Sequence, residues 1–124
     1  MERDIYGDIT AIMLRLGLRP KLVGFNYLRE AVALVCERQG VGDNMTSDIY
    51  PKVAEKFDVS DLLVERCIRV SIADAFKTGG LLAINELYDN LVYNNTFTWS
   101  NSELISIISE IVKLKDLRDN LLKN

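Results

Sequence analysis

The chain has 124 residues, a formal net charge of -3, no histidine and two cysteines. This length fits one domain, expected to span 1–124, which buries about two-thirds of its unfolded surface without needing disulfides or metals. The composition excludes histidine-based triads and histidine-ligated zinc, and the chain has neither a membrane-spanning apolar run nor the order of a signal peptide, so we expect a cytoplasmic protein with no membrane partner.

Apolar residues recur at helical spacing throughout, which predicts an all-α fold of about six helices in a compact orthogonal bundle. The first helix covers about 3–16 and ends at Gly17, and the second covers about 24–38. Cys36 and Cys67 fall within apolar helical patterns, and we expect both to be reduced core thiols.

The stretch from Met45 to Lys77 predicts a short helix, a tight break and a longer helix, which is the layout of a helix-turn-helix. The third helix covers about 46–57, with Thr46 or Ser47 as its cap. Pro51 is late for a first-turn proline, so either the helix proper begins near Ile49 or its first turn is distorted. The fourth covers about 60–78, with Ser60 as its cap.

Two further helices complete the expected fold. The fifth covers about 81–92, and a polar, aromatic loop follows over 93–100. Asn101 and Ser102 open the last helix, which covers about 102–120. No window alternates in the manner of a strand for long enough to predict one.

A helical wheel of the fourth helix separates an apolar face from a basic one. The face expected to be buried has small residues at its centre and comprises Val64, Ile68, Ser71 and Ala75, with Cys67 and Ile72 at its flanks. The opposite face comprises Leu62, Arg66, Arg69 and Ala73, with Lys77 beside it and Glu65 at its border. Arginine bonds guanine O6 and N7 with its planar fork, and glutamate accepts from cytosine N4. The alternative is a solvated face in which Glu65 and Arg69 form an ordinary pair one turn apart.

The net charge of -3 opposes DNA binding, because phosphate contacts supply most of the affinity for duplex DNA. The charge is unevenly distributed, however. The segment 15–38 holds five basic residues, Arg15, Arg19, Lys21, Arg29 and Arg38, against the two acidic residues Glu30 and Glu37.

Four separated strings resemble the C-terminal effector domain of stage-zero sporulation protein A, the sporulation response regulator of spore-forming Firmicutes. They are residues 24–31 (Gly-Phe-Asn-Tyr-Leu-Arg-Glu-Ala), 49–57 (Ile-Tyr-Pro-Lys-Val-Ala-Glu-Lys-Phe), 64–69 (Val-Glu-Arg-Cys-Ile-Arg) and 101–105 (Asn-Ser-Glu-Leu-Ile). They occur in the order of the family and at about its spacing, and the family carries a Tyr-Pro pair where this chain has Tyr50 and Pro51.

The resemblance implies a sequence-specific transcription regulator of sporulation initiation that places helix 60–78 in the major groove of double-stranded DNA. It implies a GTC-containing box, often in tandem copies, and leaves a homodimer on DNA open. The positions that face bases in the family match Glu65, Arg66 and Arg69. Contacts to the phosphate backbone are expected from Arg19, Lys21, Ser60, Lys77, Asn101 and Ser102.

The chain departs from the family at three positions where a basic residue is expected, namely Val23, Thr78 and Thr98. Each loss removes a phosphate contact and lowers the salt dependence of binding by about one unit of slope. The phosphorylatable receiver domain of the family does not fit within 124 residues. Whether the chain is a stand-alone protein or part of a longer one stays open.

The acidic balance and the missing lysines motivate an alternative function, a helical protein-interaction module with weak or lost DNA binding. Its contact patch would be Tyr93, Phe97 and Trp99, because aromatic residues are enriched at interfaces, unless these side chains fold onto the core. An enzyme is not expected, since no carboxylate pairs with a base in a recognisable motif. No cofactor or metal is expected either.

Overall fold

The computed structural model describes residues 4–38, 44–88 and 91–122. Within these ranges the chain is helical and contains no strand, which confirms the predicted all-α class with about six helices. The α-helices are α1 (Ile5–Arg15), α2 (Val23–Arg38), α3 (Tyr50–Phe57), α4 (Asp61–Thr78), α5 (Ile84–Leu87) and α6 (Asn101–Leu122).

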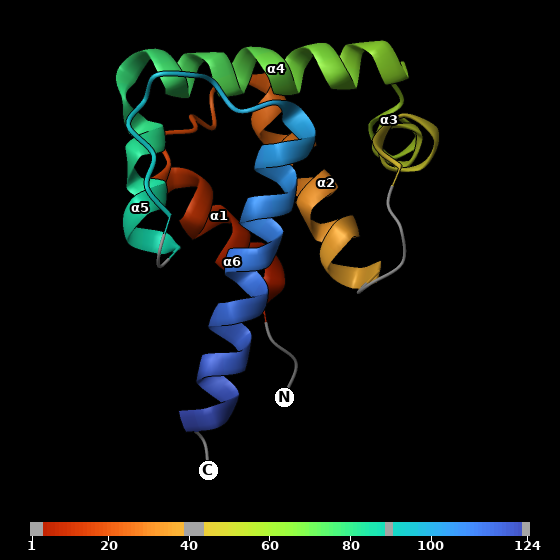
Figure 1. Cartoon of the computed structure of the whole chain (residues 1–124). Helices are drawn as coiled ribbons and strands as arrows, with labels where there is room; N and C mark the ends of the chain where they lie inside the picture. Colours follow the sequence, from red (N-terminus) through yellow and green to blue (C-terminus); the bar gives the residue numbers. More distant parts are fainter. Residues whose placement is uncertain (1–3, 39–43, 89–90, 123–124) are drawn as a thin grey trace.

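Helix α4 lies across one end of the molecule, and α6 runs away from it rather than alongside it (Figure 1). Helix α3 lies beside one end of α4, and α5 follows beyond the other (Figure 1). Helix α2 makes its most extensive contacts with α4 and α6, so it forms the centre of the bundle. The core between these helices includes Leu28, Ile68 and Leu104, all completely buried. One long face of α4 is therefore left outside the bundle.

Helix α2 approaches α4 so closely that a glycine is required at the contact. A Cβ atom on Gly24 would overlap the carbonyl oxygen of Cys67 and would lie 2.5 Å from Ser71 Oγ. Ser71 is itself buried, with 1% of its surface exposed. The small residues at the centre of the buried face of α4 thus allow the two helix backbones to meet.

The start of the helix-turn-helix differs from the prediction. A π-helical turn (Met45–Ile49) precedes α3, and its cap is Asn44, whose Oδ1 accepts a hydrogen bond from Ser47 N at 3.1 Å. The predicted cap at Thr46 or Ser47 is wrong because the helical turns begin earlier. The extra turn also explains Pro51, which lies in the first turn of α3, where a missing N–H costs little.

The break between α3 and α4 is built as predicted. Asp58 ends α3 in the left-handed conformation with φ 55°, which aspartate tolerates better than most residues. Ser60 then caps α4, since its Oγ accepts a hydrogen bond from Leu63 N at 3.1 Å. Gly79 ends α4 with φ 77°.

The fifth helix is shorter than predicted. A 3-10 turn (Gly80–Ala83) leads into α5, which ends at Leu87 instead of continuing to residue 92. The side chain of Asn85 donates to Tyr93 O at 2.6 Å and accepts from Tyr93 N at 2.7 Å. These two bonds draw the following chain back onto α5 and replace the bonds of a longer helix. Residues 89–90 lie outside the described ranges.

The aromatic loop folds mainly inward. Tyr93 is 3% exposed and donates from its hydroxyl to Phe97 O at 2.6 Å, and Trp99 is half-buried against both rings. Only Phe97 stays largely exposed, so the aromatic patch of the interaction-module alternative is reduced to one residue. Both cysteines are free thiols, Cys36 buried and Cys67 half-buried.

The described helices offer no membrane span, because none of them is both long and apolar enough to cross a bilayer.

Candidate nucleic-acid interface

The outer face of α4 presents two arginines to solvent. Arg66 is exposed and has no ion pair or hydrogen bond to a described residue, and the side chain of Arg69 is 64% exposed. Leu62 and Val70 on the same side are also exposed. Because Val64, Ile68, Ser71, Ile72 and Ala75 form the buried face, the predicted orientation of the helix is confirmed.

The base-facing candidates are held in different ways. Glu65 Oε1 accepts from Arg69 Nη2 at 2.7 Å, which is the pair one turn apart that the sequence suggested. The pair orders the guanidinium along the helix without burying it. Arg66 has no such partner among the described residues, and Ala73, one turn beyond Arg69, adds little bulk. A surface of this shape can enter a major groove about 12 Å wide.

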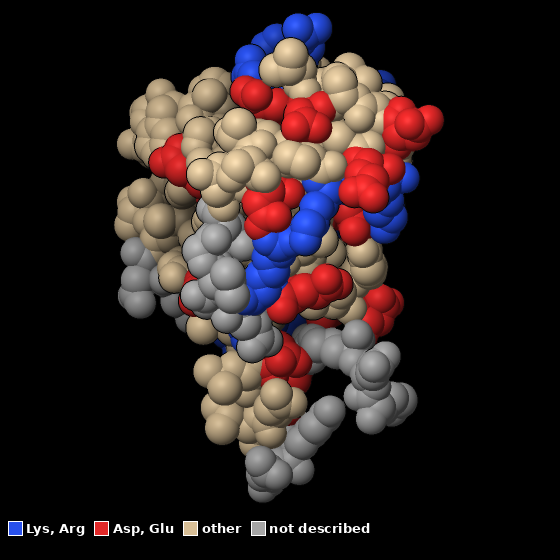
Figure 2. Space-filling model, turned by 90° about the vertical axis from the view of Figure 1, so that its right-hand side faces the viewer, with Lys and Arg blue, Asp and Glu red and all other residues tan. Residues whose placement is uncertain are grey.

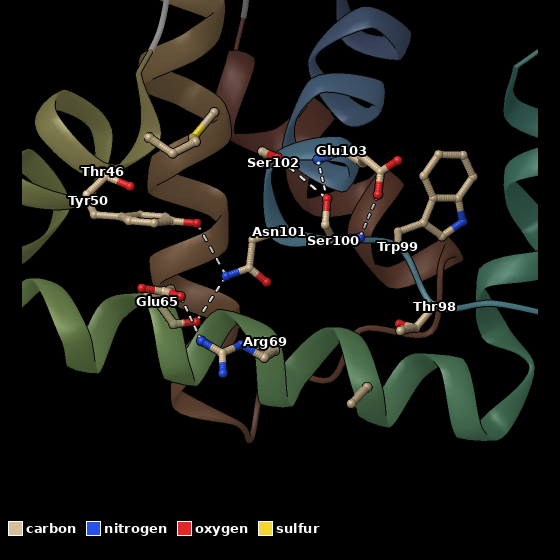
Figure 3. A pocket seen from close by; sticks show the side chains of 12 residues that line it. Thr46, Tyr50, Glu65, Arg69, Thr98, Trp99, Ser100, Asn101, Ser102 and Glu103 are labelled. Atoms are coloured by element: carbon tan, nitrogen blue, oxygen red, sulfur yellow. Dashed lines mark hydrogen bonds and ion pairs between the residues drawn. The ribbon is translucent and has the colours of Figure 1, made fainter.

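Asn101 fixes the start of α6 against α4. Its Nδ2 donates to the backbone oxygen of Glu65 at 3.0 Å and to the hydroxyl of Tyr50 at 3.3 Å (Figure 3). Burial raises the pKa of the Tyr50 hydroxyl above its usual range. Asn101 was predicted as a phosphate contact, and in this structure its amide is engaged in joining α3, α4 and α6. This bridge sets the position of the outer face of α4.

A cleft of about 540 Å³ opens beside that bridge. Its walls come from the first turns of the helix-turn-helix, the middle of α4 and the start of α6, with Thr98 and Trp99 at one side (Figure 3). The predicted phosphate contact Ser102 lies exposed on its wall. The cleft thus places Arg69 and Ser102 along one surface.

A capping box closes the start of α6. Ser100 N donates to Glu103 Oε1 at 3.0 Å, and Glu103 N donates to Ser100 Oγ at 3.2 Å. These bonds to Ser100 hold the pKa of the Glu103 carboxyl below its usual range. The helix N-terminus therefore already faces a carboxylate, which weakens it as a site for a DNA phosphate.

Three of the remaining phosphate candidates, Arg19, Lys21 and Lys77, lie near the C-terminal end of α4. The Arg19 guanidinium donates to both carboxylate oxygens of Asp74, from Nε to Oδ2 at 2.7 Å and from Nη2 to Oδ1 at 2.5 Å. The Arg19 guanidinium, with further help from Lys21 and Lys77, holds the pKa of the Asp74 carboxyl below its usual range. Both lysines are exposed. The structure thus brings Arg19, Lys21 and Lys77 together around one carboxylate.

The structure separates the other candidates from this basic group. Ser60 lies exposed at the opposite end of α4, where its hydroxyl serves as the helix cap.

Three positions where the resemblance implied a basic residue carry none. Val23 and Thr98 are exposed, and the Thr78 hydroxyl donates to Ala75 O at 3.1 Å. None of these three side chains supplies the positive charge that the resemblance led us to expect.

Charge on the molecule is mixed rather than uniformly positive. Figure 2 shows basic side chains at the edge where α4 lies, whereas acidic side chains are interspersed with basic ones over the face below it. This view shows no continuous positive surface over that face. On this face, the basic side chains at the α4 edge are the ones least interspersed with acidic side chains.

Two residues that support this surface were missed by the sequence reasoning, the half-buried Asp74 and the buried Tyr50. Asp74 meets an arginine 55 positions earlier in the chain, so no local spacing signals the pair. Tyr50 stands in a string that matched the family, but its bond to Asn101 spans 51 positions. Both contacts depend on how the helices pack.

The family model "Sporulation initiation factor Spo0A C terminal" matches residues 9–112. The match includes α2, α3, α4 and most of α6, and with them the Asn101 bridge and the Arg19–Asp74 pair. It therefore covers the outer face of α4 and the residues that surround it. This chain belongs to the family of the C-terminal domain of the sporulation initiation factor Spo0A, which is a DNA-binding regulatory domain.

Proposed function

We propose that this chain is a sequence-specific DNA-binding regulator that inserts α4 into the major groove of a GTC-containing box. The observation that carries the proposal is the exposed outer face of α4, on which Arg66 and Arg69 stand one turn apart. Arg66 and Arg69 bond guanine edges, and Glu65 accepts from cytosine N4. To reach a base, Arg69 rotates away from Glu65, which is a small cost because exposed pairs of this kind contribute only a few tenths of a kcal/mol.

The phosphate contacts divide between the two ends of α4. Arg19, Lys21 and Lys77 serve one end. Ser60 serves the other, and Ser102 lines the cleft beside the middle of the helix. Asn101 acts through α4, because its amide holds the Glu65 backbone in place.

Titration of labelled duplexes with and without a GTC box, at fixed moderate salt, tests this function. We expect Arg66→Ala to weaken binding to the GTC duplex by about 1–3 kcal/mol and to bring it toward binding of the control duplex. The matched control is Arg118→Ala, which removes the same exposed charge from α6. Equal affinity of the unaltered protein for both duplexes, with no effect of Arg66→Ala, would contradict the proposal.

A homodimer on tandem boxes is proposed through the second half of α6. Leu114, Leu117 and Leu121 recur there at helical spacing and are 40%, 56% and 69% exposed. We expect Leu117→Lys to reduce cooperative binding to a tandem box by about fivefold or more while leaving binding to a single box unchanged. Val92→Lys is the control, because Val92 is exposed but lies off this stripe. Retained cooperativity in Leu117→Lys excludes this contact.

A further inference from the structure

The carboxylate of Asp74 binds the Arg19 guanidinium in the same two-bond geometry that a DNA phosphate would use. Both carboxylate oxygens accept from the guanidinium, at 2.7 Å from Nε and 2.5 Å from Nη2. Arginine binds carboxylates and phosphates through the same parallel fork. While this pair persists, Arg19 presents no free fork to an incoming DNA strand.

The position of Asp74 makes this pairing consequential. Asp74 belongs to α4 itself, five positions after Arg69, and its side chain is only 20% exposed, compared with 46% for Arg19. Lys21 and Lys77 both act electrostatically on the same carboxylate. One negative charge therefore sits among the three cations that serve this end of the helix.

We infer that Asp74 is an internal competitor for the DNA backbone, which withholds Arg19 from a phosphate and lowers sequence-independent affinity. The inference rests on the proposed function, since it assumes that α4 approaches DNA. A phosphate that reaches Arg19 must displace the carboxylate and lie beside its negative charge. Exchange of one anion for another gives little net gain, and it releases fewer counterions than an unpaired arginine would.

The replacement Asp74→Asn keeps the size of the side chain and removes its charge. On a duplex without a GTC box, we expect it to raise affinity roughly tenfold at low salt, which is the scale of one charge-assisted contact. It should also steepen the plot of log affinity against log salt by about one unit, so that the gain over the unaltered protein changes about 3.5-fold between 50 and 200 mM salt.

The double variant Arg19→Ala, Asp74→Asn separates release of Arg19 from a general change of charge. We expect Arg19→Ala alone to weaken binding, because it leaves the Asp74 carboxylate without its arginine partner, and the double variant to lose the added slope of Asp74→Asn. The matched control is Glu86→Gln. Glu86 lies on α5, away from the outer face of α4 (Figure 1), and its side chain pairs at 2.6 Å with Arg15 at the end of α1. That variant changes the net charge equally and should leave the slope unaltered.

The two proposals fail in different ways. Sequence-specific function is measured by the ratio of affinities for duplexes with and without the GTC box, whereas the Asp74 effect is measured on the duplex that lacks it. An unchanged affinity and slope in Asp74→Asn overturns the competitor role, as does an equal gain in Glu86→Gln or in the double variant. A ratio of one together with the expected slope change overturns only sequence specificity. No binding by any variant overturns both.

Discussion

Replacement of Gly24 by alanine tests how α4 is positioned. An alanine in a helix interior is ordinarily favoured over glycine by about 0.5–1 kcal/mol. At Gly24 the new Cβ would overlap the carbonyl oxygen of Cys67, which belongs to the backbone of α4 and cannot rotate away. Helices α2 and α4 must separate, and overpacking of this kind costs about 1–3 kcal/mol, occasionally more.

Because the overlap is with backbone, we place the cost near the upper end of that range, at about 3 kcal/mol, so Gly24→Ala should lower the free energy of unfolding by about 2 kcal/mol after the helical preference is subtracted. For a chain of this length that corresponds to a fall in Tm of about 6–10 °C. Thermal unfolding followed by circular dichroism measures it. Affinity for the GTC duplex should fall as well, because α4 moves relative to the Asn101 bridge.

The matched control is Gly7→Ala in α1. The atoms nearest to a Cβ there belong to the side chain of Asp4, which is exposed and can turn aside, although it caps the helix through Gly7 N. The helical gain and the weakened cap nearly cancel, so we expect a change within about 0.5 kcal/mol. If Gly24→Ala is as stable as Gly7→Ala, the close contact between α2 and α4 does not constrain the fold, and the reasoning is refuted.

Three further variants probe the ends of the helices. Glu103→Gln keeps the capping box, but it should flatten the loss of stability in acid: the pKa of Glu103 is lowered on folding, so its contribution is present above its ordinary value of 4.5 and disappears as pH falls through the folded pKa. Denaturant melts from pH 7 to 3 would show this, and parallel curves for the two proteins would contradict it. Asn101→Ala should cost about 0.5–1.5 kcal/mol in the same melts, because α6 loses its hydrogen bonds to the Glu65 carbonyl and to the buried Tyr50 hydroxyl, and an unchanged stability would show that these bonds do not fix α6 against α4. Asp58→Gly should raise Tm slightly, since glycine adopts φ 55° without strain, whereas a lower Tm would mean that the Asp58 side chain stabilises the turn.

Helix positions and faces followed from the sequence where the signal was local. The buried face of α4 could be predicted from spacing alone, because a helix that packs one face against the core repeats its apolar residues every three or four positions. Ser60 and Gly79 marked the limits of α4 for similar local reasons. Spacing already pointed to α4 as the helix that would face DNA, and the resemblance strengthened that expectation.

The errors occurred where distant contacts override local preference. The fifth helix was predicted too long because nothing near Leu87 signals that Asn85 will bond to Tyr93. The early π-helical turn before α3 was missed because Thr46 and Ser47 are, by residue type, about as good helix caps as Asn44, which is the cap that the structure uses. The pairing of Arg19 with Asp74 has no signal at all in the sequence, since the two residues meet only after α1, α2 and α4 pack.

The structure fixes the position of α4 firmly, whereas it neutralises the charge of Arg19, the arginine beside it, with a carboxylate. Helix α4 is fixed on one side by the Gly24 contact and on another by the Asn101 bridge, so Arg66 and Arg69 stand on a rigid support. The nearby arginine suited to grip a phosphate, Arg19, is already bonded to a carboxylate. In the proposed complex with DNA, a surface of this kind would give little sequence-independent affinity and would keep its base contacts. Its ratio of specific to non-specific binding should therefore exceed that of the same surface carrying Asp74→Asn, even though the variant binds every duplex more tightly.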